Sequence, residues 1–391
     1  MFEYLGFVWY IPLIVVISFY TMYGSIALLL GREDKYKEML KRIKDYSYKP
    51  FISIVIPTYN EEKIIATKLN NTLSTDYPKD RLEIIVVDSS DDDTPKIVEE
   101  YARYNHFIKL VRTERRGVAY ALNKAYSMAR GDIVIKTDCD SMLRSNSISE
   151  IVSNFADKSI GAVTSRLIAS NNEDLEVNYR SIQHRIQIAE SMLDSTYIFQ
   201  PFSAFRRELI RPITTSADDA DVALNIRKQG YRVVYDPHSI FYEASPLDTK
   251  ERIEVKSRRA VGHINLLLKN IRLCFNPKLS SYGMLILPMN LFMIVISPLL
   301  VLLIPVFSTL DILTTRAFLV LDCMILTSIP LLIVLRNKPV ISKIWTVLEL
   351  QLIQFIALIR VIKHKDMYTW KRAETTREYY ARTNIGTSNT N

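Results

Sequence analysis

The stretch GDIVIKTDCDSM, residues 131–142, sets two aspartates directly behind a short apolar run that predicts a buried strand. Asp138 and Asp140 are separated by a single residue. Aspartate is common in turns, so a loop without any chemistry is one explanation of this pair. A site for a metal ion or a phosphate is the other, because carboxylate oxygens are ligands of hard cations. The surrounding sequence has to decide between the two.

The flanking sequence predicts a parallel sheet. Residues 51–245 alternate short apolar runs with segments of helical period. The apolar runs predict strands at 51–57, 82–88, 107–113 and 131–138, and the periodic segments predict helices at 61–73, 94–104 and 118–130. This alternation is typical of βαβ units, which build a parallel sheet with helices on both faces.

Three polar loops follow the predicted strands: PTYNEE (57–62), DSSDDDT (88–94) and TDCDS (137–141). Ligands of such sheets bind beyond the carboxyl ends of the strands, where these loops lie. Acidic loops suit a divalent cation that in turn carries a diphosphate. The sequence contains neither a Walker loop nor a glycine-rich dinucleotide fingerprint, which argues against an ATPase and against a dehydrogenase.

Long apolar runs predict membrane helices at both ends of the chain. Residues 4–30 carry no charge and are long enough to cross a hydrocarbon core of about 30 Å. We expect a retained helix rather than a cleaved signal, since Glu3 stands where a signal has basic residues. Two more runs lie at 284–308 and 317–335; Asp322, within the second, is expected to face a neighbouring helix. Residues 341–362 are more polar and predict an interfacial helix or a fourth span.

The net charge of +8 is concentrated beside these apolar runs. Residues 31–49, 250–272 and the tail after Lys363 are basic, which places them in the cytoplasm by the positive-inside rule. Nucleic-acid binding is disfavoured, because no aromatic-basic motif of a known binder is present. The three cysteines are widely separated and imply neither a metal site nor a disulfide framework.

Six motifs, in order along residues 51–262, resemble those of the membrane-anchored branch of family 2 glycosyltransferases: IPTYNEE, VVDSSDDDT, ALNKAYSMARGDIVIKTDCDS, FRRELI, DDADVALNIRKQGYRVVYDP and YEASP. The resemblance implies an α/β GT-A domain, also called the nucleotide-diphospho-sugar transferase fold, together with transmembrane α-helices. It also implies a nucleotide-sugar donor and a Mg²⁺ or Mn²⁺ ion. The expected organisation is a transmembrane helix (1–30), a basic linker (31–50), a cytoplasmic GT-A domain (51–262), an interfacial helix (263–282), two transmembrane helices (283–336), an interfacial or fourth transmembrane helix (341–362) and a basic cytoplasmic tail (363–391).

The resemblance assigns the donor side of the site. Pro57, Thr58, Tyr59 and Glu61 match the loop that cradles the nucleoside, although Glu61 would also suit the first turn of a helix. Asp88 matches the acid that binds the base, whereas Asp91, Asp92 and Asp93 are expected to cap the next helix with Thr94. Asp138 matches the acid on the ribose side, and Asp140 matches the metal ligand.

The resemblance also assigns a general base, which takes the proton of the acceptor hydroxyl. The family carries a Glu-Asp pair, and TSADDADVAL offers Asp218 and Asp219 at those positions. Asp219 is the expected base. The alternative is capping of the following helix, which Asp218 or Asp221 can also perform.

The chain departs from the family pattern in three places. Gly117-Val118-Ala119-Tyr120 lacks the usual lysine, for which Arg115 or Arg116 can substitute. Gln200 and Phe202 are expected to reshape the acceptor pocket. The Gln-x-x-Arg-Trp motif of processive synthases is replaced by Val255-Lys256-Ser257-Arg258-Arg259, in which Lys256 and Arg258 are expected to face the diphosphate and Arg259 stands in place of the tryptophan.

The leading hypothesis is therefore an inverting, metal-dependent glycosyltransferase on the cytoplasmic side of the cell membrane, with several membrane passes. Its partners would be a nucleotide-sugar donor and a lipid or lipid-linked glycan acceptor. The alternatives are a processive polysaccharide synthase and a non-catalytic membrane scaffold. Because Arg259 replaces a sugar-stacking tryptophan and suits an anionic acceptor, we expect one or few sugars to be added.

Overall fold

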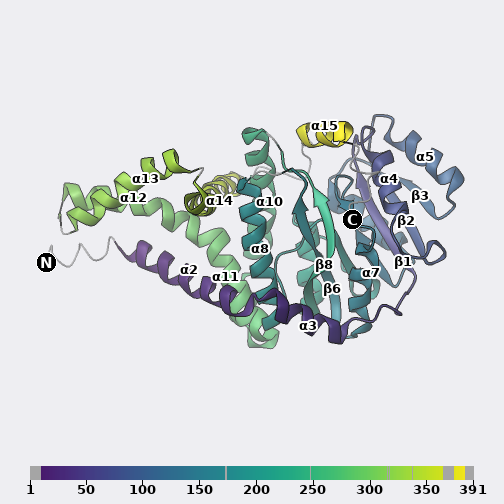
Figure 1. Cartoon of the computed structure of the whole chain (residues 1–391), viewed down its shortest axis with the longest axis horizontal. Helices are drawn as coiled ribbons and strands as arrows, with labels where there is room; N and C mark the ends of the chain where they lie inside the picture. The colour runs from purple at the N-terminus through teal and green to yellow at the C-terminus, as the bar shows by residue number, and fades with distance from the viewer. Residues whose placement is uncertain are drawn as a thin grey trace.

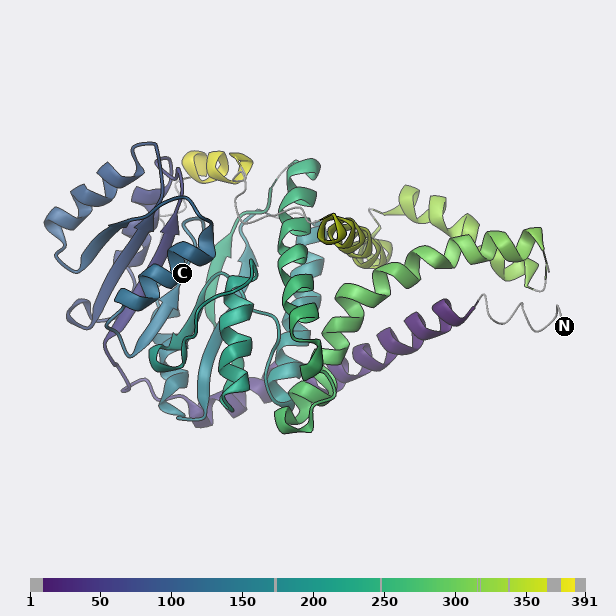
Figure 2. The same cartoon turned by 180° about the vertical axis from the view of Figure 1, so that it is seen from behind.

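The computed structural model describes residues 10–171, 174–246, 248–314, 316, 318–336, 338–363 and 374–383. An α/β body occupies one end of the molecule, and helices extend from it at the other (Figures 1 and 2). The predicted transmembrane residues 1–9, and Lys365, Lys371 and Arg372 of the predicted tail, lie outside the described residues.

The α/β body contains one sheet, with the strand order β3-β2-β1-β4-β7-β6-β8-β5 within the described residues. Its strands are β1 (Ile52–Thr58), β2 (Leu82–Asp88), β3 (Ile108–Arg112), β4 (Ile133–Lys136), β5 (Met142–Leu143), β6 (Ile160–Ala169), β7 (Ser203–Arg206) and β8 (Arg232–Glu243). The first four are mutually parallel and match the predicted strands closely.

The expectation of an all-parallel sheet is wrong, because β7 runs antiparallel to β4 and β6 and β5 runs antiparallel to β8. The cause is the connection into β7. After helix α8 (Asp174–Leu193), residues 194–202 carry the chain back to the carboxyl edge of β4 and β6, where Ser203 pairs with Lys136 and Thr164. A strand that starts from that edge can only run antiparallel to its neighbours.

Helices cover both faces of the sheet, as predicted. Ile52, Ile54 and Ile56 of β1 belong to the core beneath α4 (Ile65–Leu73), α5 (Thr94–Tyr104) and α7 (Ser147–Ser153). Val55 points to the opposite face and packs with residues of α6 (Val118–Met128) and α9 (Asp218–Lys228). This alternation follows from the two-residue period of a strand, and it makes β1 a buried central strand.

Two predicted boundaries need correction. The linker at 31–50 contains helix α3 (Glu33–Ile43), which is amphipathic and packs Tyr36 and Leu40 against Ile188 and Tyr235. The boundary at 262/263 falls inside α10 (Thr249–Lys269). Gly262 does not end this helix because its backbone remains helical, and the missing side chain instead allows close packing on residues 216–217.

Within the part of the chain that the structure describes, three helices are long and apolar enough to cross a membrane: α2 (Ile11–Leu30), the helix Tyr282–Leu313, and residues Ile341–Ile362 of α14 (Pro339–Ile362). The second contains α11 (Leu287–Leu291), α12 (Ser297–Leu313) and two π-helical turns, and α13 (Leu319–Leu335) is a shorter apolar helix. Figures 1 and 2 show α2, α12 and α13 extending away from the sheet, whereas α14 is seen nearly end-on between them and α10, so that it runs crosswise. Asp322 of α13 is buried and accepts a hydrogen bond from Tyr10 beside α2, as expected of an acid that faces a neighbouring segment.

Candidate active site

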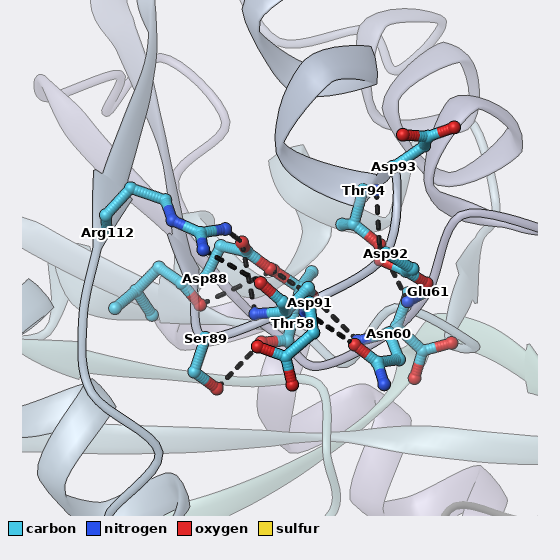
Figure 3. Close-up of polar contacts among 12 residues, drawn as sticks. Thr58, Asn60, Glu61, Asp88, Ser89, Asp91, Asp92, Asp93, Thr94 and Arg112 are labelled. Carbon is cyan, nitrogen blue, oxygen red and sulfur yellow. Dashed lines mark hydrogen bonds and ion pairs between the residues drawn. The ribbon is translucent and has the colours of Figure 1, made fainter.

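The loops after β1 and β2 are tied to each other at the carboxyl edge of the sheet (Figure 3). The Asn60 amide donates to Ser90 Oγ at 2.7 Å, and the Asp91 amide donates to Asn60 Oδ1 at 2.9 Å. Of the three aspartates predicted to cap the next helix, Asp92 accepts from the Thr94 amide at 3.0 Å, whereas the N-cap residue Asp93 makes no side-chain capping bond. Asn60 adopts a left-handed backbone with φ of 54°, which asparagine tolerates better than most residues. The two loops therefore form one rigid rim.

Asp88 lies beneath this rim. Its carboxylate accepts from Thr58 Oγ1 at 2.8 Å, from Ser90 Oγ and from Arg112, and its side chain is fully buried (Figure 3). In this arrangement the protein itself supplies the partners of both carboxylate oxygens. The predicted contact of Asp88 with a nucleobase stays a prediction.

A cavity of about 760 Å³ lies above the carboxyl edge of the sheet. Most of the residues predicted for the site line it: Pro57, Thr58, Tyr59, Glu61, Asp138, Asp140, Asp218, Asp219, Lys256, Arg258 and Arg259. The fold thus brings together segments that are about 200 residues apart in the chain, and Asp138 and Asp140 both line the cavity.

Two buried lysines contact the loop that carries Asp138 and Asp140. Lys68 of α4 donates to Thr137 Oγ1 at 2.8 Å and to the Ser141 carbonyl, and burial lowers its pKa to about 8. Lys136 ends β4 and lies 3.0 Å from Asp138 Oδ1. The loop is therefore held from both sides, which orients its carboxylates before any ligand arrives.

Asp218 and Asp219 occupy the first turn of α9 and face the same lysine. Lys136 Nζ lies 3.2 Å from Asp218 Oδ2 and 2.9 Å from Asp219 Oδ2. Burial raises the pKa of Asp219 well above its usual range, the neighbouring Asp218 raises it further, and Lys136 opposes both effects. Asp221 performs the structural role instead, because its carboxylate accepts from the Thr214 and Thr215 amides at 2.7 and 2.9 Å. Asp219 is thereby left available for chemistry.

Helix α10 forms a basic wall opposite the aspartates. Lys256 pairs with Glu176 at 2.8 Å, and Arg259 pairs with Glu243 at 2.9 Å. Burial lowers the pKa of Arg258 to about 10, with a further lowering from the adjacent Arg259. Three partly exposed cations that line one cavity suit the two phosphates of a nucleoside diphosphate.

Helix α15 (Glu374–Thr383) closes the cavity from above. Arg377 donates to Asp140 Oδ2 at 2.9 Å and to Glu61 at 2.6 and 3.1 Å. Burial opposes ionisation of Asp140, but Arg377 and Arg259 outweigh it and lower the pKa of this carboxyl. Tyr380 anchors the same helix by accepting from the Ala244 amide at 2.8 Å. Residues 370–373, directly before this helix, lie outside the described part of the chain.

The structure corrects two predicted site residues. Phe202 is fully buried and packs edge-to-face on Phe241 in the sheet core, so it does not shape the acceptor pocket; Gln200, two residues earlier, lines the cavity. Arg116 pairs with Glu114 at the surface. The cavity is lined by Arg115, whose guanidinium stacks 3.7 Å from the centre of the Tyr59 ring, because the Gly117 turn directs only one of the two arginines inward.

Sequence reasoning missed three residues that line or close the site: Lys136, Glu243 and Arg377. Lys136 had a visible signal, because a lysine at the end of a buried apolar strand requires a charged partner. Glu243 stood in the YEASP motif without an assigned role. Arg377 ends the segment WKRAETTR, which resembles a Trp-Arg element that processive relatives hold near the diphosphate, but its contact with Asp140 could not be predicted because the two residues are 237 positions apart.

The donor atoms fit a divalent cation. Asp140 and Asp138 supply hard carboxylate oxygens inside the cavity. No group of three or more His, Cys, Asp or Glu among the described residues is arranged to hold a metal ion. That is the pattern of Mg²⁺ sites, in which one or two carboxylates are completed by substrate phosphates and water.

Comparison with known proteins agrees with this geometry. Residues 53–214 match the glycosyl transferase family 2 profile. A probable glycosyltransferase, YdaM of Bacillus subtilis, is 28% identical over 62% of this chain and 61% of its own length. A poly-β-1,6-N-acetyl-D-glucosamine synthase of Staphylococcus aureus is 25% identical over 68% of this chain and 67% of its own. The chain thus spans about two thirds of the length of these curated relatives.

One solved structure is similar over nearly the whole chain. The mannosyltransferase PcManGT of Pyrobaculum calidifontis, in complex with GDP-mannose and Mn²⁺, superposes with a TM-score of 0.71 at 27% identity. The match covers 90% of this chain and 99% of that one. The sheet, the site and these similarities together show that residues 53–214 form a domain similar to glycosyl transferase family 2 and that the α/β body has the GT-A type of fold.

Proposed function

We propose that the protein is an inverting, metal-dependent glycosyltransferase that moves a sugar from a nucleotide-diphosphate sugar to a lipid or lipid-linked acceptor on the cytoplasmic face of the membrane. The observation that carries this proposal is the extent of the cavity. Its lining runs from the aspartates at the sheet to Tyr20, Tyr23 and Leu28 of α2 and to Leu350 and Gln354 of α14. A single cavity that is polar at the sheet and apolar among long hydrophobic helices fits a substrate with a reactive polar head and a lipid tail.

The donor is expected to lie along the carboxyl edge of β1 and β4. Tyr59 and its stacked Arg115 offer a flat surface for the nucleoside, and Asp138 is placed for the ribose. Lys256 and Arg258 face the diphosphate from α10. Asp140 would hold a Mg²⁺ or Mn²⁺ ion, whose role when bound is to stabilise negative charge on the departing nucleoside diphosphate. The presence of Mn²⁺ and GDP-mannose in the similar mannosyltransferase supports this class of donor.

The acceptor hydroxyl is expected to approach from the membrane side and to give its proton to Asp219. Asp219 Oδ2 is held by Lys136, while its buried Oδ1 has no hydrogen-bond partner within the described residues. That second oxygen is therefore available to accept a proton in the cavity. A base and a leaving group on opposite sides of the sugar carbon produce inversion in one displacement.

The crosswise orientation of α14 favours the interfacial interpretation of residues 341–362 (Figures 1 and 2). With α14 at the interface, α2 leads the chain in and α12 and α13 return it to the same side. Helix α15 packs on the transferase domain through Arg377 and Tyr380, which requires the two to share one side of the membrane. The basic flanks indicate that this side is the cytoplasm.

A donor panel tests the proposed function. Membranes that contain the protein are incubated with radiolabelled UDP- and GDP-sugars, with and without Mn²⁺, and are then extracted with organic solvent. We expect label from one donor to enter the lipid fraction only with the cation and not with an Asp219→Asn variant. Label that stays aqueous as a large, glycosidase-sensitive polymer supports the processive synthase instead. Absence of turnover with every donor would contradict the transferase activity.

A further inference from the structure

Lys136 joins three carboxylates that come from two distant parts of the chain. It is the last residue of β4, follows three isoleucine and valine residues, and is 3% exposed. Its ammonium nitrogen lies 3.0 Å from Asp138 on the donor side and 3.2 and 2.9 Å from Asp218 and Asp219 in α9. The two sides are 80 residues apart in sequence and meet at this one nitrogen.

Placing a lysine here is costly without its acids, and placing the acids here is costly without the lysine. Burial raises the pKa of Asp219, and the charges of Asp218 and Asp138 raise it further. Lys136 donates directly to Asp219 Oδ2 at 2.9 Å, and its positive charge lowers the pKa of this carboxyl. The usual glutamate of the family's acidic pair is aspartate in this chain, which shortens one of the three acids.

We propose that Lys136 is a positioning residue for the transfer reaction, and that its buried ammonium favours the carboxylate form of Asp219 and holds it in register with the donor-side Asp138. This inference rests on the proposed function of Asp219 as the base. Three ion pairs around one nitrogen fix the distance between the donor loop and the first turn of α9. Because Lys136 Nζ donates a hydrogen bond to Asp219 Oδ2, Asp219 Oδ1 is the oxygen that remains to accept a proton from the acceptor.

Other titratable side chains lie near the same cluster and contribute to the electrostatic field around Asp219 and Asp218. Tyr126 of α6 is buried beside Asp219, and burial with the nearby acids raises the pKa of its hydroxyl. Arg258 and His263 of α10 lie across the cavity and interact electrostatically with Asp218. Lys136 differs from them because it donates directly to the proposed base.

Lys68 supplies a matched control. It is the other buried lysine of the site, and it contacts the same loop through Thr137 and Ser141. The residues that its ammonium contacts do not include Asp218 or Asp219. Removing Lys68 therefore perturbs the donor loop without removing the ion pair to the base.

The test is the pH dependence of kcat/KM for sugar transfer. In Lys136→Met, the acidic limb of the profile is expected to move toward higher pH by at least about one unit, since the base loses a charge in direct contact. Lys136→Arg should restore the wild-type limb, and Lys68→Met should lower the rate without moving the limb. An unchanged limb in Lys136→Met, or an equal shift in Lys68→Met, would overturn the proposal.

Two further measurements keep the test decisive. Should Lys136→Met fail to fold, Lys136→Gln keeps a hydrogen-bond donor at this position but removes the charge, and the limb is still expected to move toward higher pH. A turnover-independent readout is the carboxyl ¹³C resonance of Asp219 in the purified full chain, assigned by its loss in Asp219→Asn. If no donor is turned over, the proposed function fails, while the resonance still decides the role of Lys136. If the Asp219 resonance titrates at the same pH in the wild type and in Lys136→Met, the proposed role of Lys136 is contradicted.

Discussion

The donor half and the acceptor half of the site are held together in different ways. On the donor half, the loops after β1 and β2 bond mainly to each other, across two parallel strands in register. On the acceptor half, charged groups are held by ion pairs between different elements. Asp219 of α9 binds Lys136 of β4, and Arg259 of α10 binds Glu243 of β8.

The difference shows where rigidity comes from in each half. The donor half is fixed mainly by backbone geometry and by hydrogen bonds between its loops. The acceptor half depends on buried ion pairs, and removal of one member of a pair leaves the buried charge of the other member unpaired. Substitutions in the two halves should therefore have separable effects on donor binding and on transfer.

The largest effect is expected for Asp219→Asn. A base acts on the acceptor, so this change should reduce kcat for transfer by roughly 10²- to 10⁴-fold and leave nucleotide binding intact. Asp140→Asn is the counterpart on the donor half, and it should weaken metal-stimulated nucleotide binding because an amide is a poorer ligand for a hard cation. Calorimetry with nucleotide and Mn²⁺, alongside initial rates, separates the two. Retention of more than about a tenth of the rate in Asp219→Asn would remove Asp219 from the role of base.

The sequence predicted the donor half well for a physical reason. Strands β1, β2 and β4 carry continuous apolar runs, and each ends in a polar loop, so their position at one edge follows from parallel pairing. Asp138 and Asp140 were found from this local pattern. The capping role of Asp92 was also local, because its partner Thr94 is two residues away.

The acceptor half was less predictable because its contacts are long-range. The sequence predicts that Phe202 lies in the acceptor loop. In the structure its side chain is instead buried in the sheet core, beside Phe241. The antiparallel direction of β7 depends on the path of residues 194–202, which no local signal reveals. Arg377 reaches Asp140 only because the chain returns from α14 to the sheet. Family resemblance supplied the base Asp219, and the structure supplied its partner.

The second prediction tests the packing that holds α9 in place. A side chain at Gly262 of α10 would lie 2.9 Å from the Ala217 amide nitrogen, directly before Asp218. Gly262→Ala should therefore displace the first turn of α9 and reduce transfer by roughly 10- to 100-fold with little change in nucleotide affinity. Leu268→Ala, at an exposed position of the same helix, is the control. An equal loss of nucleotide affinity in Gly262→Ala would show that the two halves are not separable.

The third prediction concerns the bridge between the halves. Arg377 of α15 neutralises Asp140 and Glu61, so Arg377→Gln should strengthen Mn²⁺ binding without nucleotide by roughly tenfold. Electron paramagnetic resonance of free Mn²⁺ during a titration measures this directly. Lys63→Gln is the control, because Lys63 makes a surface contact with Glu374 of the same helix at 3.9 Å. Unchanged or weaker binding in Arg377→Gln would argue that the arginine does not compete with the cation.

The smallest effect is expected in the acid stability of the acceptor half. Burial, with a contribution from Arg259, lowers the pKa of His263 in α10 to about 4, while in the unfolded chain it is about 6.5. Between these values the unfolded chain binds a proton that the folded chain excludes, so stability falls as the pH drops from 6.5 toward 4. At pH 5.5 the cost is about 1.4 kcal/mol, or a shift in Tm of about 2 °C. His263→Gln should remove this part of the decline between pH 7.5 and 5.5, whereas His106→Gln, at an exposed position of the donor half, should not. Thermal unfolding followed by fluorescence measures both, and parallel curves for wild type and His263→Gln would contradict the assignment of acid sensitivity to α10.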